Sequence, residues 1–305
     1  MNRTMAGWWF VAPALSVIAV FFVLPVLAAL MVSFTDFDIY ALADLRNLRF
    51  VGLRNYLQLL ETPLFWHALG NTLYFVIVGV PLSIGASLGV ALLLNSPLVR
   101  ARSFFRTALF IPVVTTLVAV AVVWRYLYHP RAGLLNYALG AIGVGPIDWL
   151  GDPTYAMPAI ALMSIWKGFG FPMLVFLASL QAIPERLYEA ARIDGAGRWH
   201  QLCWITLPML RPTFVFVGVM TAIGALQLFA EPYVMTGGGP ADSTLSLVLL
   251  MYRQGFRWWN LGPATAVAFV LFAIMLAISA VTLRQRGGVD SAAPANAGWR
   301  PGALR

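Results

Sequence analysis

The sequence Glu189-Ala190-Ala191-Arg192-Ile193-Asp194-Gly195-Ala196 lies between two long apolar stretches of the chain. Pro184 precedes it, at a point where a helix can begin because the N–H that proline lacks has no partner in the first turn. After Pro184, four residues recur at three- and four-residue spacing and so share one helix face, namely Leu187, Ala190, Ala191 and Asp194. The segment therefore predicts a short amphipathic helix in an aqueous connection.

The residues that follow predict a sharp turn and a second short helix. Gly195 supplies a permissive backbone for the turn. Trp199, Leu202 and Ile205 form the apolar face of the second helix, which Pro208 is expected to end. Such a helix pair either offers a surface to a partner on the aqueous side or lies on its own protein, and the spacing alone leaves both interpretations open.

The rest of the chain is too apolar for a soluble domain. Of its 305 residues, 60% are hydrophobic and 10% are charged. Nearly uncharged runs of about 18 or more residues are typical of membrane helices, and the period-two alternation of a membrane barrel is absent. We therefore predict an all-α membrane protein with one transmembrane domain over residues 1–290 and a disordered, Ala-, Gly- and Pro-rich tail over 291–305. Its six transmembrane helices are expected near 8–33, 69–94, 104–128, 155–180, 213–234 and 261–283.

The basic and acidic residues that give the net charge of +8 are distributed unevenly among the loops. Arginines gather in the N-terminus, near 100–106, near 186–211 and near 284–286, whereas most acids fall in the other loops. By the positive-inside rule, both termini and the connection at 184–208 lie on the cytoplasmic side. This distribution explains the positive charge without a nucleic-acid partner, and we expect none.

The connection resembles the EAA loop of permease subunits of binding-protein-dependent ABC importers, of the carbohydrate-uptake type. The matching residues are Glu189, Ala190, Ala191, Asp194, Gly195, Ala196, Leu202, Ile205 and Pro208. That family usually has phenylalanine at the position of Leu202, so the apolar side chain is kept but its area is smaller. The resemblance implies the fold of a type I importer permease, in which residues 184–208 form a coupling loop that docks into a groove of a separate ATPase subunit.

Two other segments are similar to segments of the same family. Residues 50–56, Phe-Val-Gly-Leu-Arg-Asn-Tyr, resemble a stretch that follows the first span in many carbohydrate-type permeases. Residues 236–240, Thr-Gly-Gly-Gly-Pro, resemble a turn after the penultimate span. For the first segment an interfacial helix anchored by Tyr56 and Trp66 is an equally compatible interpretation.

The resemblance also implies the partners of the chain. These are a second, homologous permease subunit, two cytoplasmic ATPase subunits and an extracytoplasmic solute-binding protein, in the cytoplasmic (inner) membrane of a prokaryote, in contact with its lipid. We expect the chain not to be an enzyme and to bind no cofactor. ATP and Mg²⁺ would bind the ATPase subunits, because a phosphate-binding loop needs a lysine after a glycine run and the one lysine here, Lys167, lies inside an apolar span. No metal site is expected either, since the three histidines are not spaced as paired ligands.

The fourth predicted span carries that lysine near its middle, where a charge is costly and usually faces a cavity or a partner. Nearby glycines and Pro172 predict a kink, which is tolerated at membrane depth where it lines a cavity. In the resembling family, the positions of Ser164, Lys167, Gly168 and Phe171 and the segment around Gln227 face the substrate. We predict that these residues, with Glu231, line a sugar path, although the aromatic ring also fits packing or lipid contact.

The sequence leaves other solutes open and gives no signal of two other protein classes. A permease for glycerol phosphate, a polyol or another small solute is a close alternative, because Lys167 and Arg125 would suit a phosphate. An ATP-independent carrier usually has an internal repeat, and a membrane enzyme needs a convergent catalytic cluster. Neither signal is found in the sequence. Whether Lys167 pairs with Glu231 or contacts substrate stays open.

Overall fold

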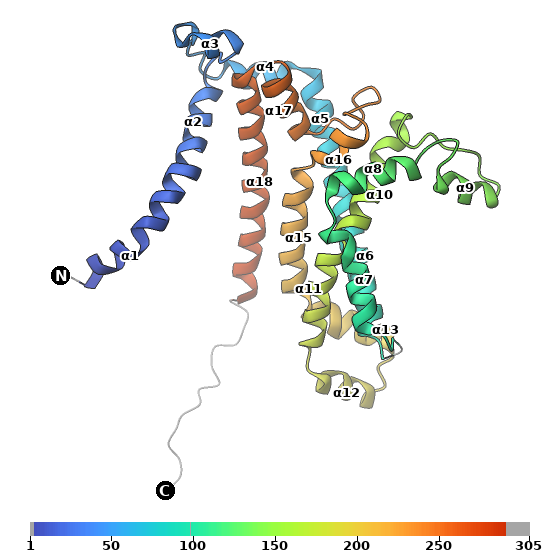
Figure 1. Cartoon of the computed structure of the whole chain (residues 1–305). Helices are drawn as coiled ribbons and strands as arrows, with labels where there is room; N and C mark the ends of the chain where they lie inside the picture. The colour runs from blue at the N-terminus through green and yellow to red at the C-terminus, as the bar shows by residue number, and fades with distance from the viewer. Residues whose placement is uncertain (1–2, 98, 291–305) are drawn as a thin grey trace.

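The computed structural model describes residues 3–97 and 99–290, and nearly all of these residues belong to helices or their connections (Figure 1). Among them, the only β pairing is an isolated bridge between Thr35 and Phe50. The predicted all-α architecture is confirmed for this part of the chain. The predicted tail, residues 291–305, lies outside the described residues.

The N-terminal half contains ten helices, several joined by short π-helical or 3₁₀ turns. Their bounds are α1 (Arg3–Ile18), α2 (Leu24–Ser33), α3 (Ile39–Ala43), α4 (Arg54–Glu61), α5 (Pro63–Tyr74), α6 (Val80–Asn95), α7 (Arg102–Val114), α8 (Leu117–Leu127), α9 (Leu134–Ala141) and α10 (Pro153–Gly168). Pi-helical turns at Ala19–Val23 and Phe75–Gly79 join α1 to α2 and α5 to α6.

The C-terminal half continues in the same manner. Its helices are α11 (Gly170–Gln181), α12 (Glu185–Ile193), α13 (Arg198–Gln201), α14 (Leu207–Met209), α15 (Arg211–Leu226), α16 (Ala230–Met235), α17 (Leu247–Tyr252) and α18 (Leu261–Asp290). Two more π-helical turns, at Leu202–Thr206 and Arg253–Arg257, lie between α13 and α14 and after α17.

Three uninterrupted helical segments are long and apolar enough to cross a membrane. They are Phe10–Ser33, Pro63–Asn95 and Leu261–Ala280, and they correspond to the first, second and sixth expected spans. The second begins at Pro63 rather than near residue 69, because a proline can occupy the first turn of α5 without losing a hydrogen bond. Counting three bent helix pairs as one span each brings the total to six.

The bent pairs show where the expected spans are interrupted. Helices α7 and α8 meet at 97°, and α10 and α11 meet at 48°. At the first break Thr115 and Thr116 are extended, and the Thr115 hydroxyl donates to the Pro112 carbonyl, so a side chain competes with the helical backbone. The region expected as one span over 104–128 is therefore two helices at nearly a right angle.

The fifth expected span, 213–234, also differs from the structure. Helix α15 ends at Leu226, and α16 begins after a non-helical step. Pro232 lies in the first turn of α16 and has no N–H to donate to the Leu228 carbonyl, which instead accepts from the Ser246 hydroxyl. The third bent pair joins Arg198–Met209 to α15 at 65°, so the apolar segment around α15 extends toward its N-terminal side instead.

The core lies between helices from the second to the sixth expected spans. Helix α11 packs along α6, and α15 packs against both and against α18. The first helix differs, because no residue in its most apolar window is buried and α2 reaches the bundle mainly at α18. Figure 1 shows α1 and α2 standing apart from the other helices.

The segment 50–56 attaches that first helix to the bundle. The Asn55 side chain is buried and donates to the carbonyls of Ser33 and Thr35, both at 2.8 Å, and the Tyr56 hydroxyl donates to the Ser33 hydroxyl at 2.8 Å. Carbonyls at a helix C-terminus have no partner within the helix. Asn55 therefore caps α2, and Tyr56 is bonded to the chain in addition to any contact with the membrane interface.

Candidate functional sites: a central cavity and an exposed helix pair

A cavity of about 390 Å³ lies between the second, fourth and fifth expected spans. Apolar and small residues make up most of its wall, which includes Phe75, Gly79, Val80, Ser83, Ser164, Ile165, Gly168, Phe171, Pro172, Met220, Thr221, Gly224, Ala225, Leu228 and Glu231. A mostly apolar cavity of a few hundred cubic ångströms with a few polar groups is the usual form of a small-molecule site. The Ser164 hydroxyl oxygen is buried and has no hydrogen-bond partner among the described residues, although Ser164 belongs to the cavity wall.

The break between α10 and α11 forms one wall of this cavity. It falls at Phe169, between Gly168 and Gly170. Pro172 occupies the first turn of α11 and has no N–H for the carbonyl of Gly168, so the helix cannot continue straight through this point. The predicted kink is thus present, and it places Gly168 and Phe171 on either side of the bend and against the cavity.

Of the six residues predicted to line the path, the structure brings four together. Ser164, Gly168, Phe171 and Glu231 line the cavity. The sequence interpretation missed Thr221 and the contribution of the second span, including Ser83 and Phe75. A helical wheel of the second span could have suggested Ser83, which is a polar residue in an apolar run.

Lys167 lies beside the cavity rather than in its wall. It is half-buried near the end of α10, and its Nζ donates to the Val113 carbonyl at the end of α7 at 3.5 Å. The charge of Lys167 acts on the half-buried Glu231 carboxylate, but no ion pair joins the two side chains among the described residues. The positive charge of Lys167 therefore acts on the cavity from outside its wall.

Gln227 faces a different surface. It follows the last residue of α15 and is exposed, and its Nε2 lies 3.8 Å from the Met275 sulfur on α18. It is not among the residues that line the cavity. Its role in the path stays a prediction.

The exposed helix pair at 184–208 is closed by a compact turn. Helix α12 ends at Ile193, and Gly195 has φ +79°, the left-handed conformation that favours glycine. The Ala196 N–H donates to the Ala191 carbonyl at 2.8 Å and the Gly195 N–H to the Arg192 carbonyl at 3.1 Å, which is the Schellman arrangement. The small residues and the glycine of this sequence are therefore explained by the backbone that ends α12.

Side-chain bonds hold the second helix against the first. The Gln201 Nε2 donates to the Ala196 carbonyl at 2.8 Å, and the hydroxyls of Tyr188 and Thr206 are 2.9 Å apart. Between the two helices lies a hollow of about 440 Å³, bordered by Ala191, Asp194, Gly195, Ala196, Gly197, His200, Gln201 and Ile205. The pair thus presents a fixed concave surface.

Four of the nine predicted loop residues are exposed, and the other five are half-buried. Glu189, Ala190, Asp194 and Gly195 are exposed, and no ion pair among the described residues involves Glu189 or Asp194. Trp199, Leu202 and Ile205 are expected to share one apolar face of the second helix. Trp199 is instead 75% exposed, whereas Leu202 and Ile205 are half-buried.

The end of the second helix also differs from the expectation. Pro208 does not end it, because α14 continues to Met209. The preceding π-helical turn, in which the Leu207 N–H bonds to the Leu202 carbonyl, accommodates a residue that cannot donate.

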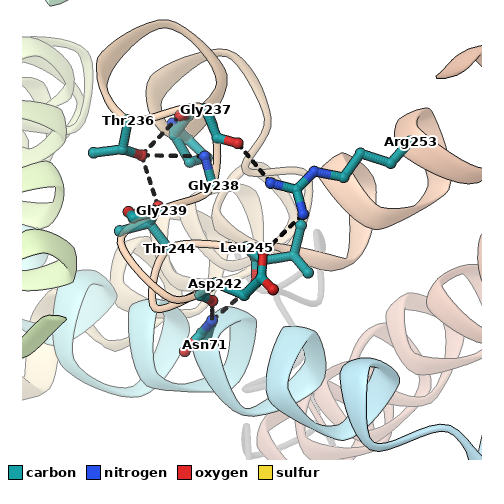
Figure 2. Close-up of polar contacts among 10 residues, drawn as sticks. Asn71, Thr236, Gly237, Gly238, Gly239, Asp242, Thr244, Leu245 and Arg253 are labelled. Carbon is teal, nitrogen blue, oxygen red and sulfur yellow. Dashed lines mark hydrogen bonds and ion pairs between the residues drawn. The ribbon is translucent and has the colours of Figure 1, made fainter.

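The glycine-rich turn at 236–240 lies at the end of the molecule opposite α12 (Figure 1) and is strongly cross-linked. Figure 2 shows the Arg253 guanidinium between Asp242 and the Gly237 carbonyl, both at 2.7 Å. The Asn71 side chain donates to the carbonyls of Asp242 and Leu245 at 2.8 and 3.0 Å. These contacts fix the turn to α5 and to the residues after α17.

Comparison with known proteins gives a consistent result. Residues 83–286 match the family model described as "Binding-protein-dependent transport system inner membrane component". The lactose transport system permease protein LacF of Rhizobium radiobacter is 39% identical over 278 residues, which cover 90% of this chain and 91% of the relative. The trehalose/maltose transport system permease protein MalF of Thermococcus litoralis is 37% identical, with 91% and 92% covered. A chain of a bacterial alginate ABC transporter, solved with a periplasmic protein, shares the fold with a TM-score of 0.77 at 24% identity, covering 92% of this chain and 93% of that one.

Proposed function

Because the chain belongs to the family of binding-protein-dependent transport system inner membrane components, we propose that it is the permease subunit of an ATP-driven sugar importer and forms half of the translocation path. The cavity between α6, α10, α11 and α15 is the observation that carries this proposal. Lactose and trehalose/maltose permeases among the relatives support a sugar as the solute.

The chemistry of the cavity suits an uncharged, hydroxylated solute. The Phe171 ring, 49% exposed, offers a flat apolar face to the C–H groups of a sugar ring. The Ser164 hydroxyl and the Glu231 carboxylate supply hydrogen-bonding groups for sugar hydroxyls. Of the residues that line the cavity, one is acidic and none is basic, and the only lysine points its amine at the Val113 carbonyl. A phosphorylated solute would meet an acid without a compensating base in this wall, so a neutral sugar is the better candidate.

The helix pair at 184–208 is the proposed joint with the ATPase. It is exposed, rigidly turned and concave, and it lies at the end of the molecule opposite the glycine-rich turn (Figure 1). In the proposed complex, this chain and a second permease subunit share two cytoplasmic ATPase subunits and an extracytoplasmic solute-binding protein in the inner membrane. ATP and Mg²⁺ bind the ATPase subunits, whose closure moves the coupling loops and opens the path outward. Both termini and the coupling loop then lie in the cytoplasm.

The cavity is tested by replacing Phe171 with leucine, which removes the ring but keeps an apolar side chain. Uptake of radiolabelled lactose, trehalose and maltose is measured in proteoliposomes that contain the permease, the ATPase and the binding protein. Loss of one ring–sugar contact of about 0.5–1.5 kcal/mol lowers uptake of the transported sugar about two- to tenfold.

The matched control is Phe216→Leu on α15, because Phe216 is 41% exposed and does not line the cavity. It should leave uptake unchanged, and both variants should retain the ATPase on purification. Import of glycerol phosphate but of none of these sugars by the wild-type complex would contradict the proposed sugar substrate.

A further inference from the structure

Four aromatic rings form a continuous strip at the end of the molecule that we propose to be the outer one. The aromatic strip consists of Phe229, Tyr233, Tyr252 and Phe256, contributed by the start of α16, the end of α17 and the π-helical turn that follows α17. The centroid of Tyr233 lies 5.3 Å from those of Phe229 and Tyr252, and Tyr252 lies 5.6 Å from Phe256. Figure 1 shows α16 and α17 together at the end opposite α12.

The strip is not a closed piece of hydrophobic core. Phe256 is 66% exposed and Tyr233 is 47% exposed, whereas Phe229 and Tyr252 are half-buried against α17 and α18. The four rings could contact one another and still be covered by the rest of the chain, but two of them are exposed. A partner with flat apolar faces can therefore add to the strip without displacing any contact within the chain.

The strip adjoins the cavity through the backbone. Leu228 lines the cavity, and Phe229, the next residue, begins the strip. Helix α16 carries the cavity carboxylate Glu231 on one side and the strip residue Tyr233 on another. The strip and the cavity wall are thus contiguous along the backbone of α16 but lie on different faces of that helix.

Polar groups lie within the same surface. The rings of Tyr233 and Tyr252 lie 5.3 Å apart, so their phenol groups belong to one surface, and interaction with Tyr233 raises the pKa of Tyr252 above its ordinary value. The charge of Arg257 also reaches Tyr252. Aromatic faces combined with hydroxyl groups that can donate and accept match a sugar ring, which has apolar C–H faces and a polar edge.

We propose that the aromatic strip is a second sugar-binding site, which holds a sugar ring at the outer end of the path before the ring enters the cavity. The inference rests on the proposed sugar-import function. It differs from that function in assigning binding to α16 and α17 rather than to the cavity. Four rings in mutual contact across two helices also differ from the single tryptophans and tyrosines that anchor spans at a membrane interface.

The test is saturation-transfer NMR of sugar binding to the assembled permease–ATPase complex in lipid nanodiscs. Aromatic protein protons are irradiated, and transfer to the ring protons of lactose, trehalose or maltose is recorded. Tyr233→Leu and Phe256→Leu, alone and together, remove rings but keep apolar side chains. Each single variant is expected to lower the transferred signal and the rate of sugar uptake about two- to tenfold, with a larger loss in the double variant. Tyr233→Phe, which keeps the ring, should lose less.

Phe272→Leu is the matched control, because Phe272 on α18 is 46% exposed and contacts Phe269 rather than the strip. It should behave as the wild type. Strip variants that match this control, while Phe171→Leu lowers the signal, would overturn the strip and leave the cavity intact. A wild-type complex that shows neither transfer nor uptake with any of the three sugars would overturn the sugar-import function itself. The variant Phe256→Leu alters a largely exposed side chain, so its result does not depend on the refolding of a core.

Discussion

Gly170 lies where the first turn of α11 crosses α7, and the crossing leaves no room for a side chain. A Cβ atom at this position would lie 2.8 Å from the Leu109 carbonyl oxygen and 2.9 Å from a Val113 methyl. Both groups belong to α7, and the carbonyl is part of the backbone, so it cannot rotate away. The same contact holds the bend at Phe169 and, with it, one wall of the cavity.

Gly170→Ala is therefore expected to destabilise the permease by about 1–3 kcal/mol, because the backbones of α7 and α11 must separate. Thermal unfolding of the purified complex in detergent measures the change as a lower Tm. Gly218→Ala on α15 is the matched control, since its Cβ would meet nothing within 4 Å and the substitution should leave the Tm unchanged or slightly higher. Equal Tm values for the two variants would contradict the close-contact role of Gly170.

Some of the residues that line the cavity could be predicted from the sequence, and others could not. The resemblance to carbohydrate-type permeases singled out Ser164, Gly168 and Phe171, and a kink with a proline and a nearby charge indicated a cavity in the same span. Thr221 was missed although, like Ser83, it is a polar residue in an apolar run, because a hydroxyl in a membrane helix can also bond to its own backbone. Lys167 lies beside the kink, but its amine contacts the Val113 carbonyl of α7 and the residue is not in the cavity wall, a packing outcome that no spacing rule contains.

The coupling loop behaves as one element because its turn is made by its own residues. The backbone bonds from Gly195 and Ala196 return to α12, and the Gln201 side chain bonds to the Ala196 carbonyl. The loop orientation therefore depends on the left-handed backbone at Gly195 together with the side-chain bonds of Gln201 and Tyr188. If the loop transmits motion between the ATPase and the path, distortion of this turn should weaken the link without removing the partner.

Gly195→Val tests that dependence, since a left-handed backbone costs about 1–2 kcal/mol for a non-glycine residue and more for a β-branched one. We expect sugar uptake to fall while ATP hydrolysis continues, so that the number of sugar molecules imported per ATP decreases in reconstituted liposomes. Gly197→Ala is the control in the same loop, because Gly197 has φ −68° and open space around it. A ratio that is unchanged by Gly195→Val would argue against a coupling role for the turn.

Among the elements, the long helices could be read from hydropathy, but the breaks could not. A sliding-window hydropathy average does not register that Pro232 leaves the Leu228 carbonyl without a backbone donor. It therefore extends the fifth span past Leu226, where α15 ends. It is equally insensitive to the pair Thr115 and Thr116, whose extended backbone turns α8 by 97° from α7. Both breaks depend on where a displaced carbonyl finds its next hydrogen bond, which is a tertiary property.

The whole molecule has two unlike ends. One carries the coupling loop, and the other carries α9, the glycine-rich turn and the aromatic strip (Figure 1). The arginine distribution along the sequence predicts that the first of these ends is cytoplasmic. The first helix, which buries none of its most apolar window within the chain, requires lipid or another subunit to cover it.

Cysteine labelling in intact cells tests this orientation. In a Cys203→Ser background, Tyr137→Cys on α9 and Ile193→Cys on α12 each place a thiol at a position that is 82% or 87% exposed. A membrane-impermeant maleimide should label the first variant in intact spheroplasts and the second only after permeabilisation. The reverse pattern would invert the proposed topology, and labelling of both in intact spheroplasts would contradict a single orientation.

The closed turn of the coupling loop has a consequence for how such importers can diversify. The hairpin makes its bend from its own backbone, and the cavity is formed by other helices. If the hairpin docks on the ATPase and the cavity binds the sugar, as proposed, partner choice and solute choice are encoded in separable stretches of the gene. Recombination could exchange one without redesigning the other. One ATPase could then serve several permeases for different solutes, provided that each carries the same hairpin.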